Sequence, residues 1–383
     1  MTIAPSLMHV LLIPVVSGSI FSLLTVITTW LFVRRRSPRA DFQPPVTVLK
    51  PIYGIDRELR HNLESFCTQD YPVYQVVMSL QRPQDPALPL LRELEARYPA
   101  RVTVVVADSA PSVNGKVQNM VIGLGAARHE YLVVSDSDAC APRDYLRTMV
   151  APLADPRLGF VCSLYRISCA RNVAEKLEQL SINADFMPSV IFTYLTRAAT
   201  FCLGASIAFR RSDLEAVGGM AAFADYLVED HELGRRLHAR GLGVCLVPLR
   251  VDLLADYASF GDWWSHQVYW DQNTRAANAV GFALTVLTRA VPFAALYALA
   301  AGLSAAALGV LAATIALRLA TGALVALQLE DEETLRALPW LPLRDVLGLV
   351  SWALAFTRRS FVWRGHRFRL APGGRIIPRD ETA

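Results

Sequence analysis

Two aspartates separated by one serine follow a short apolar run in EYLVVSDSDACAPRDYL, at Asp136, Ser137 and Asp138. Carboxylates at the end of a buried strand are hard oxygen ligands. Mg²⁺ or Mn²⁺ needs only one or two of them when substrate phosphates complete its coordination. The same letters also suit a polar turn that starts the helix predicted from APRDYL. The motif by itself leaves a metal site and a turn as alternatives.

Two further segments carry residues suited to a nucleotide. Asp85 is followed by Pro86, which is typical of a helix start but also places a carboxylate within reach of a ribose or base. NGKVQNM puts Lys116 and Asn119 where a loop enters a helix. An ammonium group and free helix amides at such a junction suit a phosphate, although a lysine on the surface is the alternative.

Acidic residues open a predicted helix in YLVEDHELGRRL, at Glu229, Asp230 and Glu232. Carboxylates in a first turn stabilise the helix dipole without any catalytic role. One of them is also a candidate general base for a substrate hydroxyl.

A later helical segment, WWSHQVYWDQNTR, lies just before an apolar run and contains His266, Tyr269 and Trp270. Anchoring at a membrane interface accounts for its tryptophans. It does not account for His266 and Tyr269.

The elements that position these residues alternate between two periods over residues 45–255. The apolar runs VTVLKPI, YQVVMSL, RVTVVVADS and YLVVSDS read as strands, and helical patterns separate them. This alternation predicts an α/β domain with a parallel sheet covered on both faces. Ligands of such sheets bind outside the carboxyl ends of the strands, which is where Lys50, Asp85 and Asp136 fall.

Apolar segments flank this domain in a chain that is 53% hydrophobic. Residues 8–33 carry no charge over 26 positions, enough to cross a hydrocarbon core of about 30 Å. The arginines of RRRSPR follow, which predicts that the next segment is cytoplasmic. The net charge of +4 then suits an anionic lipid surface, and nucleic acid is not expected as a partner.

The second apolar region is expected to form a transmembrane hairpin over residues 290–328, with Gly302 or Gly309 near its turn, although a single long span is the alternative. Arg318 would then lie near membrane depth, where it should snorkel or pair. The last run, VLGLVSWALAF, has 11 residues, which is short for a span and typical of a re-entrant or interfacial segment.

Together these fragments resemble the ceramide glucosyltransferase family (glycosyltransferase family 21), a membrane branch of the GT-A, Rossmann-like nucleotide-sugar transferases. The resemblance covers residues 8–370 and rests on VTVLKPIYGID, NLESFCTQDYP, GKVQNM, DSD, CLGASIAFRRSDLEAVGG and FADYLVEDHELGRRL. It implies that Asp85 contacts the nucleotide, Asp136 the metal and diphosphate, and that Asp230 is the catalytic base. HQVYW keeps the family's tryptophan but has His266 and Tyr269 where Gln or Arg and then Arg are usual.

The resemblance implies an inverting, metal-dependent enzyme that transfers glucose from UDP-glucose to a ceramide hydroxyl. Mg²⁺ or Mn²⁺ would be held by Asp136 and Asp138, with Lys50, Lys116 and Asn119 beside the donor. The departure in HQVYW leaves another lipid acceptor, such as a hopanoid polyol or diacylglycerol, as an alternative.

The expected organisation is an anchor at 1–40, a cytoplasmic GT-A domain at 41–275, a hairpin at 276–330 and an interfacial segment with a basic tail at 331–383. The arginine-rich, lysine-poor composition indicates a bacterium, and hence a multi-pass protein of the inner membrane.

Overall fold

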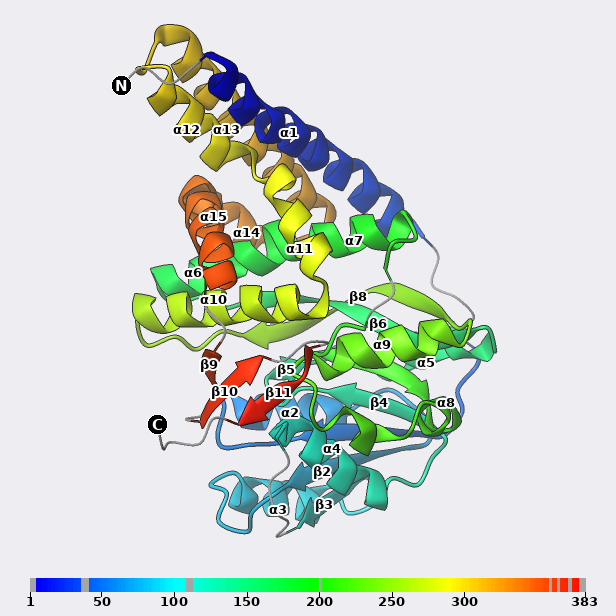
Figure 1. Cartoon of the computed structure of the whole chain (residues 1–383). Helices are drawn as coiled ribbons and strands as arrows, with labels where there is room; N and C mark the ends of the chain where they lie inside the picture. Colours follow the sequence, from blue (N-terminus) through cyan, green and yellow to red (C-terminus); the bar gives the residue numbers. More distant parts are fainter. Residues whose placement is uncertain are drawn as a thin grey trace. The chain divides into compact units, whose positions relative to one another are not determined.

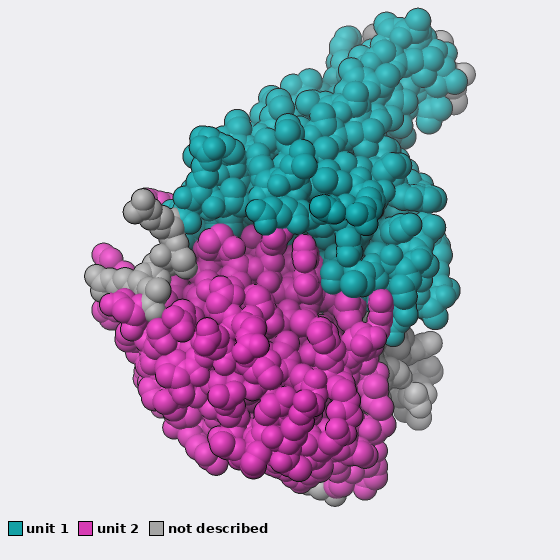
Figure 2. Space-filling view, turned by 180° about the vertical axis from the view of Figure 1, so that it is seen from behind, with its two compact units in different colours: residues 1–35, 167–196, 255–361 teal, residues 36–166, 197–254, 362–383 magenta. Residues whose placement is uncertain are grey.

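The structure is a computed structural model of the chain. It describes residues 5–35, 41–107, 113–199, 202–357, 360–363, 366–370 and 374–378. The chain separates into two compact units, each assembled from distant stretches of sequence (Figure 2). The first unit comprises Met1–Arg35, Ile167–Thr196 and Ala255–Phe361, and the second comprises Arg36–Arg166, Arg197–Leu254 and Val362–Ala383.

The second unit is built on an eight-stranded sheet with the order β3-β2-β1-β4-β7-β6-β8-β5 (Figure 1). Strands β1 to β4 are parallel to one another, whereas β7 runs antiparallel to both β4 and β6. Every residue of β1 and β2 is buried, as expected of strands covered on both faces. The strands are β1 (Val46–Pro51), β2 (Tyr74–Leu80), β3 (Val102–Val106), β4 (Tyr131–Ser135), β5 (Ala139–Cys140), β6 (Leu158–Ser168), β7 (Ser206–Arg210) and β8 (Gly243–Leu254).

Helices connect these strands, which confirms the predicted α/β class. The clearest sequence signal is at α4, where the Asn114 side chain accepts hydrogen bonds from Lys116 N and Val117 N and so caps the helix. The helices of this unit are α2 (Leu59–Cys67), α3 (Leu88–Arg97), α4 (Gly115–Ala126), α5 (Tyr145–Val150), α8 (Arg211–Ala216) and α9 (Glu229–Ala239). A three-stranded sheet, β9 (Ser360–Trp363), β10 (His366–Leu370) and β11 (Ile376–Pro378), lies near the C-terminus.

The first unit is helical apart from strand ends. Its helices are α1 (Pro5–Val33), α6 (Val173–Ser181), a π-helical turn (Ile182–Phe186), α7 (Met187–Leu195), α10 (Phe260–Ala277), α11 (Ala279–Leu284), α12 (Ala290–Ala300), α13 (Ala305–Gln328), α14 (Glu332–Ala337) and α15 (Leu341–Thr357). Among the residues that the structure describes, two stretches are long and apolar enough to cross a membrane, Met8–Val33 and Ala305–Gln328. The protein is therefore a membrane protein.

A third candidate span is broken. Ala279–Thr288 and Ala290–Ala300 pass the same test only together, and they are bent by 59° at Arg289. The chain then turns between α12 and α13, where Gly302 has a φ of +64°.

Helix α1 packs closely against the break at Arg289. A Cβ on Gly18 would lie 2.7 Å from the nitrogen of Ala290, and the Ser17 hydroxyl donates to the Leu287 carbonyl at 2.6 Å. Breaking a helix frees backbone groups that lipid cannot satisfy. Helix α1 supplies one of the partners that the break requires.

Candidate active site

The D-x-D segment leaves the sheet between β4 and β5. Its middle residue is fixed by the loop after β1, because the Ser137 hydroxyl donates to Asp56 Oδ2 at 2.5 Å. Asp136 N also donates to the Ala205 carbonyl, at 3.3 Å. Both aspartates are partly exposed and lie at the carboxyl end of β4. The position predicted for these aspartates, directly after a strand of the sheet, is thus the observed one.

Lys116, in the first turn of α4, links this segment to α9. Its Nζ lies 2.8 Å from Asp136 Oδ1 and 3.1 Å from Glu229 Oε1. It also donates to the Gly204 carbonyl at 3.3 Å. Burial by itself would lower the pKa of Lys116, but Asp136, Glu229 and Asp230 together raise it, so the ammonium stays charged. One cation therefore gathers carboxylates from two distant segments.

Asp230 lies in the first turn of α9, where the backbone N–H of His231 donates to its Oδ1 at 2.7 Å. Burial, reinforced by the neighbouring Glu229 carboxylate, raises the pKa of Asp230 to about 7. A carboxylate with this pKa is a competent general base near neutral pH. A Cβ on Gly204 would lie 2.7 Å from Asp230 Oδ2, so the space beside this carboxylate depends on a glycine.

Lys50, at the end of β1, is fully buried. It donates to the Asp136 carbonyl and, at 3.4 Å, to the Ser135 hydroxyl, and its Nζ lies 3.7 Å from the centre of the Phe66 ring. Burial lowers the pKa of Lys50 to about 7, against the opposing effect of Asp136. Lys50 thus fixes the backbone of the D-x-D segment through its hydrogen bond to the Asp136 carbonyl.

The two remaining residues predicted for the donor form hydrogen bonds with the backbone of the loop that follows β1. The Asp85 carboxylate accepts from Gly54 N at 3.0 Å and from Ala87 N at 2.9 Å, so it joins the loop after β1 to the start of α3. Asn119 is buried, and its Nδ2 donates to the Ile52 carbonyl at 2.7 Å. Both side chains fix the loop that follows β1.

The carboxylates around the D-x-D segment suit a divalent cation. Burial, with Asp136 and then Asp56, raises the pKa of Asp138 to about 7. Repulsion of this kind would be relieved by a bound cation. Within the described part of the chain no three His, Cys, Asp or Glu side chains form a complete cage. Mg²⁺ and Mn²⁺ do not require one when a diphosphate supplies the other oxygens, so Asp136 and Asp138 fit the role.

The three residues predicted for the acceptor lie together on α10, in the first unit. His266 Nδ1 lies 2.8 Å from the Tyr257 hydroxyl, and its ring centre lies 6.0 Å from that of Trp270 and 6.4 Å from that of Tyr269. Buried Glu178 accepts hydrogen bonds from the side chains of this same helix, at 3.0 Å from Trp263 and 2.6 Å from Gln267.

Several residues of these clusters are absent from the predicted set, namely Asp56, Glu178, Gly204 and Tyr257. Asp56 and Gly204 lie in the fragments GID and CLGAS, but neither fragment reveals a contact with another segment. Glu178 is hidden because an acid in the middle of a helix has no distinctive pattern.

A model described as glycosyl transferase family 21 matches residues 10–376 of the chain. The chain belongs to this family. It is 28% identical over 213 residues to ceramide glucosyltransferase 1 of Caenorhabditis elegans, a match that covers 52% of this chain and 43% of that protein. It is 32% identical over 121 residues to a ceramide glucosyltransferase of Candida albicans, covering 28% and 22%. This family 21 chain thus matches less than half the length of either relative.

Among solved structures, the family 21 chain resembles a mannosyltransferase from Pyrobaculum calidifontis in complex with GDP-Man and Mn²⁺. The TM-score is 0.55 at 22% sequence identity, over 90% of this chain and 99% of that one. This likeness and the sheet order establish the GT-A fold.

Proposed function

We propose that the protein transfers glucose from UDP-glucose to the hydroxyl of a membrane lipid, ceramide or a close analogue, with inversion at the anomeric carbon. The observation that carries the proposal is the Lys116 bridge, which joins Asp136 of the D-x-D segment at 2.8 Å to Glu229, the neighbour of Asp230, at 3.1 Å. The carboxylate proposed to hold the metal and diphosphate and the carboxylate proposed as the base thereby belong to one small cluster. The two relatives, both named ceramide glucosyltransferases, further support ceramide as the acceptor.

Within this proposal the residues of the second unit bind the sugar donor, UDP-glucose. Asp85 and Asn119 hold the loop after β1 for the nucleotide, and Lys50 supports the backbone at Asp136. The Lys116 ammonium offsets the negative charge of the diphosphate. Mg²⁺ or Mn²⁺, held by Asp136 and Asp138, would supply Lewis-acid stabilisation of the leaving diphosphate when bound.

Asp230 is the proposed base. Its carboxylate removes the proton from the lipid hydroxyl, and that oxygen attacks the anomeric carbon opposite the departing diphosphate. The pKa of about 7 allows Asp230 both to be ionised and to hold a proton near neutral pH.

The acceptor is assigned to the first unit, where His266, Tyr269 and Trp270 share α10. The protein would be a multi-pass protein of a bacterial inner membrane, with residues 41–275 in the cytoplasm. The arginines that follow the first span support this orientation. Because His266 and Tyr269 replace the family's usual residues, a hopanoid polyol or diacylglycerol is the second candidate acceptor.

The test is to express the full chain in a host without glycolipids, supply ceramide, and analyse the lipids by mass spectrometry. A new hexosylceramide in the wild type, absent in Asp230→Asn, supports the proposal. A hexosylated hopanoid or diacylglycerol instead would support the second acceptor. No new glycolipid, together with no binding of UDP-glucose in the presence of Mn²⁺, would refute a transferase function.

A further inference from the structure

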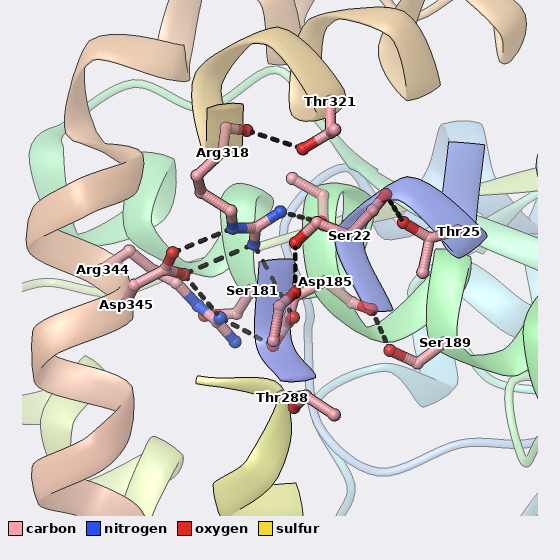
Figure 3. A network of polar contacts seen from close by, with 12 residues as sticks. Ser22, Thr25, Ser181, Asp185, Ser189, Thr288, Arg318, Thr321, Arg344 and Asp345 are labelled. Carbon is pink, nitrogen blue, oxygen red and sulfur yellow. Dashed lines mark hydrogen bonds and ion pairs between the residues drawn. The ribbon is translucent and has the colours of Figure 1, made fainter. Parts of the chain in front are cut away.

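A network of charged side chains lies inside the first unit and joins α13, α15 and the π-helical turn (Figure 3). Arg318 Nε lies 2.9 Å from Asp345 Oδ2, and Arg344 Nη1 lies 2.6 Å from Asp185 Oδ2. Arg344 Nε also donates to the Ser181 hydroxyl at 3.0 Å. Arg318 is therefore paired, as its depth in the helix required. Both guanidinium groups have acceptors within the protein.

Arg289 differs from these two arginines. It lies at the break between the two halves of the bent helix pair. Within the described residues its guanidinium makes no hydrogen bond and no ion pair, and its Nε is buried without a partner. A guanidinium has five N–H donors, and leaving buried donors unpaired is costly. An acceptor from outside the chain would remove that cost.

Space for the Arg289 head group is provided by a glycine on α15. A Cβ on Gly348 would lie 2.8 Å from Arg289 Nη1, closer than real side chains approach. The position of the guanidinium thus depends on the absence of a side chain at residue 348.

The charges around Arg289 decide what kind of ligand fits. The charged groups that interact electrostatically with Arg289 are the carboxylates of Asp185, Asp271 and Asp345 and the guanidinium of Arg344. With Arg318, three arginines face three aspartates, so the cluster as a whole is neutral. The carboxylates of Asp185 and Asp345 already neutralise Arg344 and Arg318, so the cluster has no net positive charge to attract a phosphate. A neutral oxygen acceptor, such as a hydroxyl or an amide carbonyl, does not need such a charge.

The surroundings point to a lipid as the carrier of that oxygen. Leu284, at the end of α11, and Leu287, in the turn before Arg289, are 57% and 38% exposed although they are apolar. Asp271, which acts on Arg289, directly follows Trp270 on α10, the helix to which the acceptor is assigned. A polar donor and an apolar surface together match an amphiphilic ligand.

We infer that Arg289 binds the neutral polar head group of a membrane lipid through the lipid's hydroxyl or amide carbonyl oxygens. The identity of that lipid as the glycosyl acceptor rests on the proposed function; binding itself does not.

The test measures binding and turnover separately in the purified full chain. Binding is read by photocrosslinking of a short-chain ceramide probe that carries a diazirine and an alkyne, and turnover by the dependence of hexosyl transfer on ceramide concentration. The variants are Arg289→Ala and Gly348→Ala, which displaces the guanidinium without removing it. Gly309→Ala is the matched control, because a Cβ there meets nothing within 4 Å. Thermal unfolding verifies that each variant is folded.

We expect Arg289→Ala to lower crosslinking and to raise the KM for ceramide by about tenfold, the loss of one or two hydrogen bonds, with donor binding unchanged. Gly348→Ala should likewise lower crosslinking and raise the KM for ceramide, and Gly309→Ala should match the wild type. Unchanged crosslinking in folded Arg289→Ala would overturn the inference. So would competition of the probe by phosphatidylglycerol but not by unlabelled ceramide. If the wild type crosslinks in an Arg289-dependent way but transfers no sugar, the proposed function fails while this inference stands.

Discussion

Gly204 controls the position of the proposed base, so its replacement by alanine should damage turnover much more than stability. A Cβ at residue 204 would lie 2.7 Å from Asp230 Oδ2 and 3.3 Å from Lys116 Nζ. Ordinary van der Waals contact begins at 3.4 Å, so the carboxylate must retreat by about 0.7 Å. Misplacing a reacting group by 1 Å can cost about 10²-fold in rate. We therefore expect Gly204→Ala to lower kcat by about 10- to 100-fold, or about 1.4–2.7 kcal/mol.

The assay is steady-state hexosyl transfer with both substrates varied, beside thermal unfolding of the same preparations. Donor KM should change little, because the displaced atom belongs to the base. Gly125→Ala is the matched control: it also adds one methyl group in the second unit, where nothing lies within 4 Å. If Gly204→Ala kept kcat within twofold of the control while remaining folded, the role given to the position of Asp230 would be refuted.

Three further predictions concern pH, a strand end and the buried charges. Since the pKa of Asp230 is raised to about 7 and the base acts as a carboxylate, kcat/KM should fall about tenfold per unit as pH drops below 7. A pH profile of equal slope in Asp230→Asn would contradict this. Asn119→Ala removes the hydrogen bond to Ile52 and should lower the free energy of unfolding by about 1–3 kcal/mol; weaker binding of UDP-glucose at full stability would instead indicate direct contact with the nucleotide. Arg318→Met leaves Asp345 without one of its cations and should cost about 3–5 kcal/mol in thermal unfolding in detergent, whereas Arg318→Met with Asp345→Leu should recover part of the loss.

The α/β core could be predicted because its parallel strands are buried on both faces and therefore read as continuous apolar runs. Strand β7, SIAFR, is short and sits inside a longer segment whose charges and glycines hide it. The C-terminal strands β9 to β11 are only 4, 5 and 3 residues long, too short to show a clear strand pattern in the sequence. Strand β7 pairs with β4 and β6, which are distant from it in sequence, so only the fold reveals its place.

The donor side of the candidate site was accessible to prediction because carboxyl ends of parallel strands must share one edge. That rule alone places Lys50, Asp85 and Asp136 together. It says nothing of α9, and the link from Lys116 to Glu229 depends on how that helix packs. Residues that act by leaving space, such as Gly204, have no signal in a single sequence.

Close packing of α1 on the helix break has a consequence for how this protein can be re-engineered. The Ser17 hydroxyl donates to the Leu287 carbonyl, and Gly18 lets the backbone at Ala290 pack closely. The first span is therefore not interchangeable with another hydrophobic helix of equal length. A substitute hydrophobic helix would lack the hydrogen bond to the Leu287 carbonyl. It would also place a side chain at position 18, where the backbone of Ala290 leaves room only for a hydrogen atom. Chimeras and solubilised versions of this protein should therefore keep its own N-terminal helix.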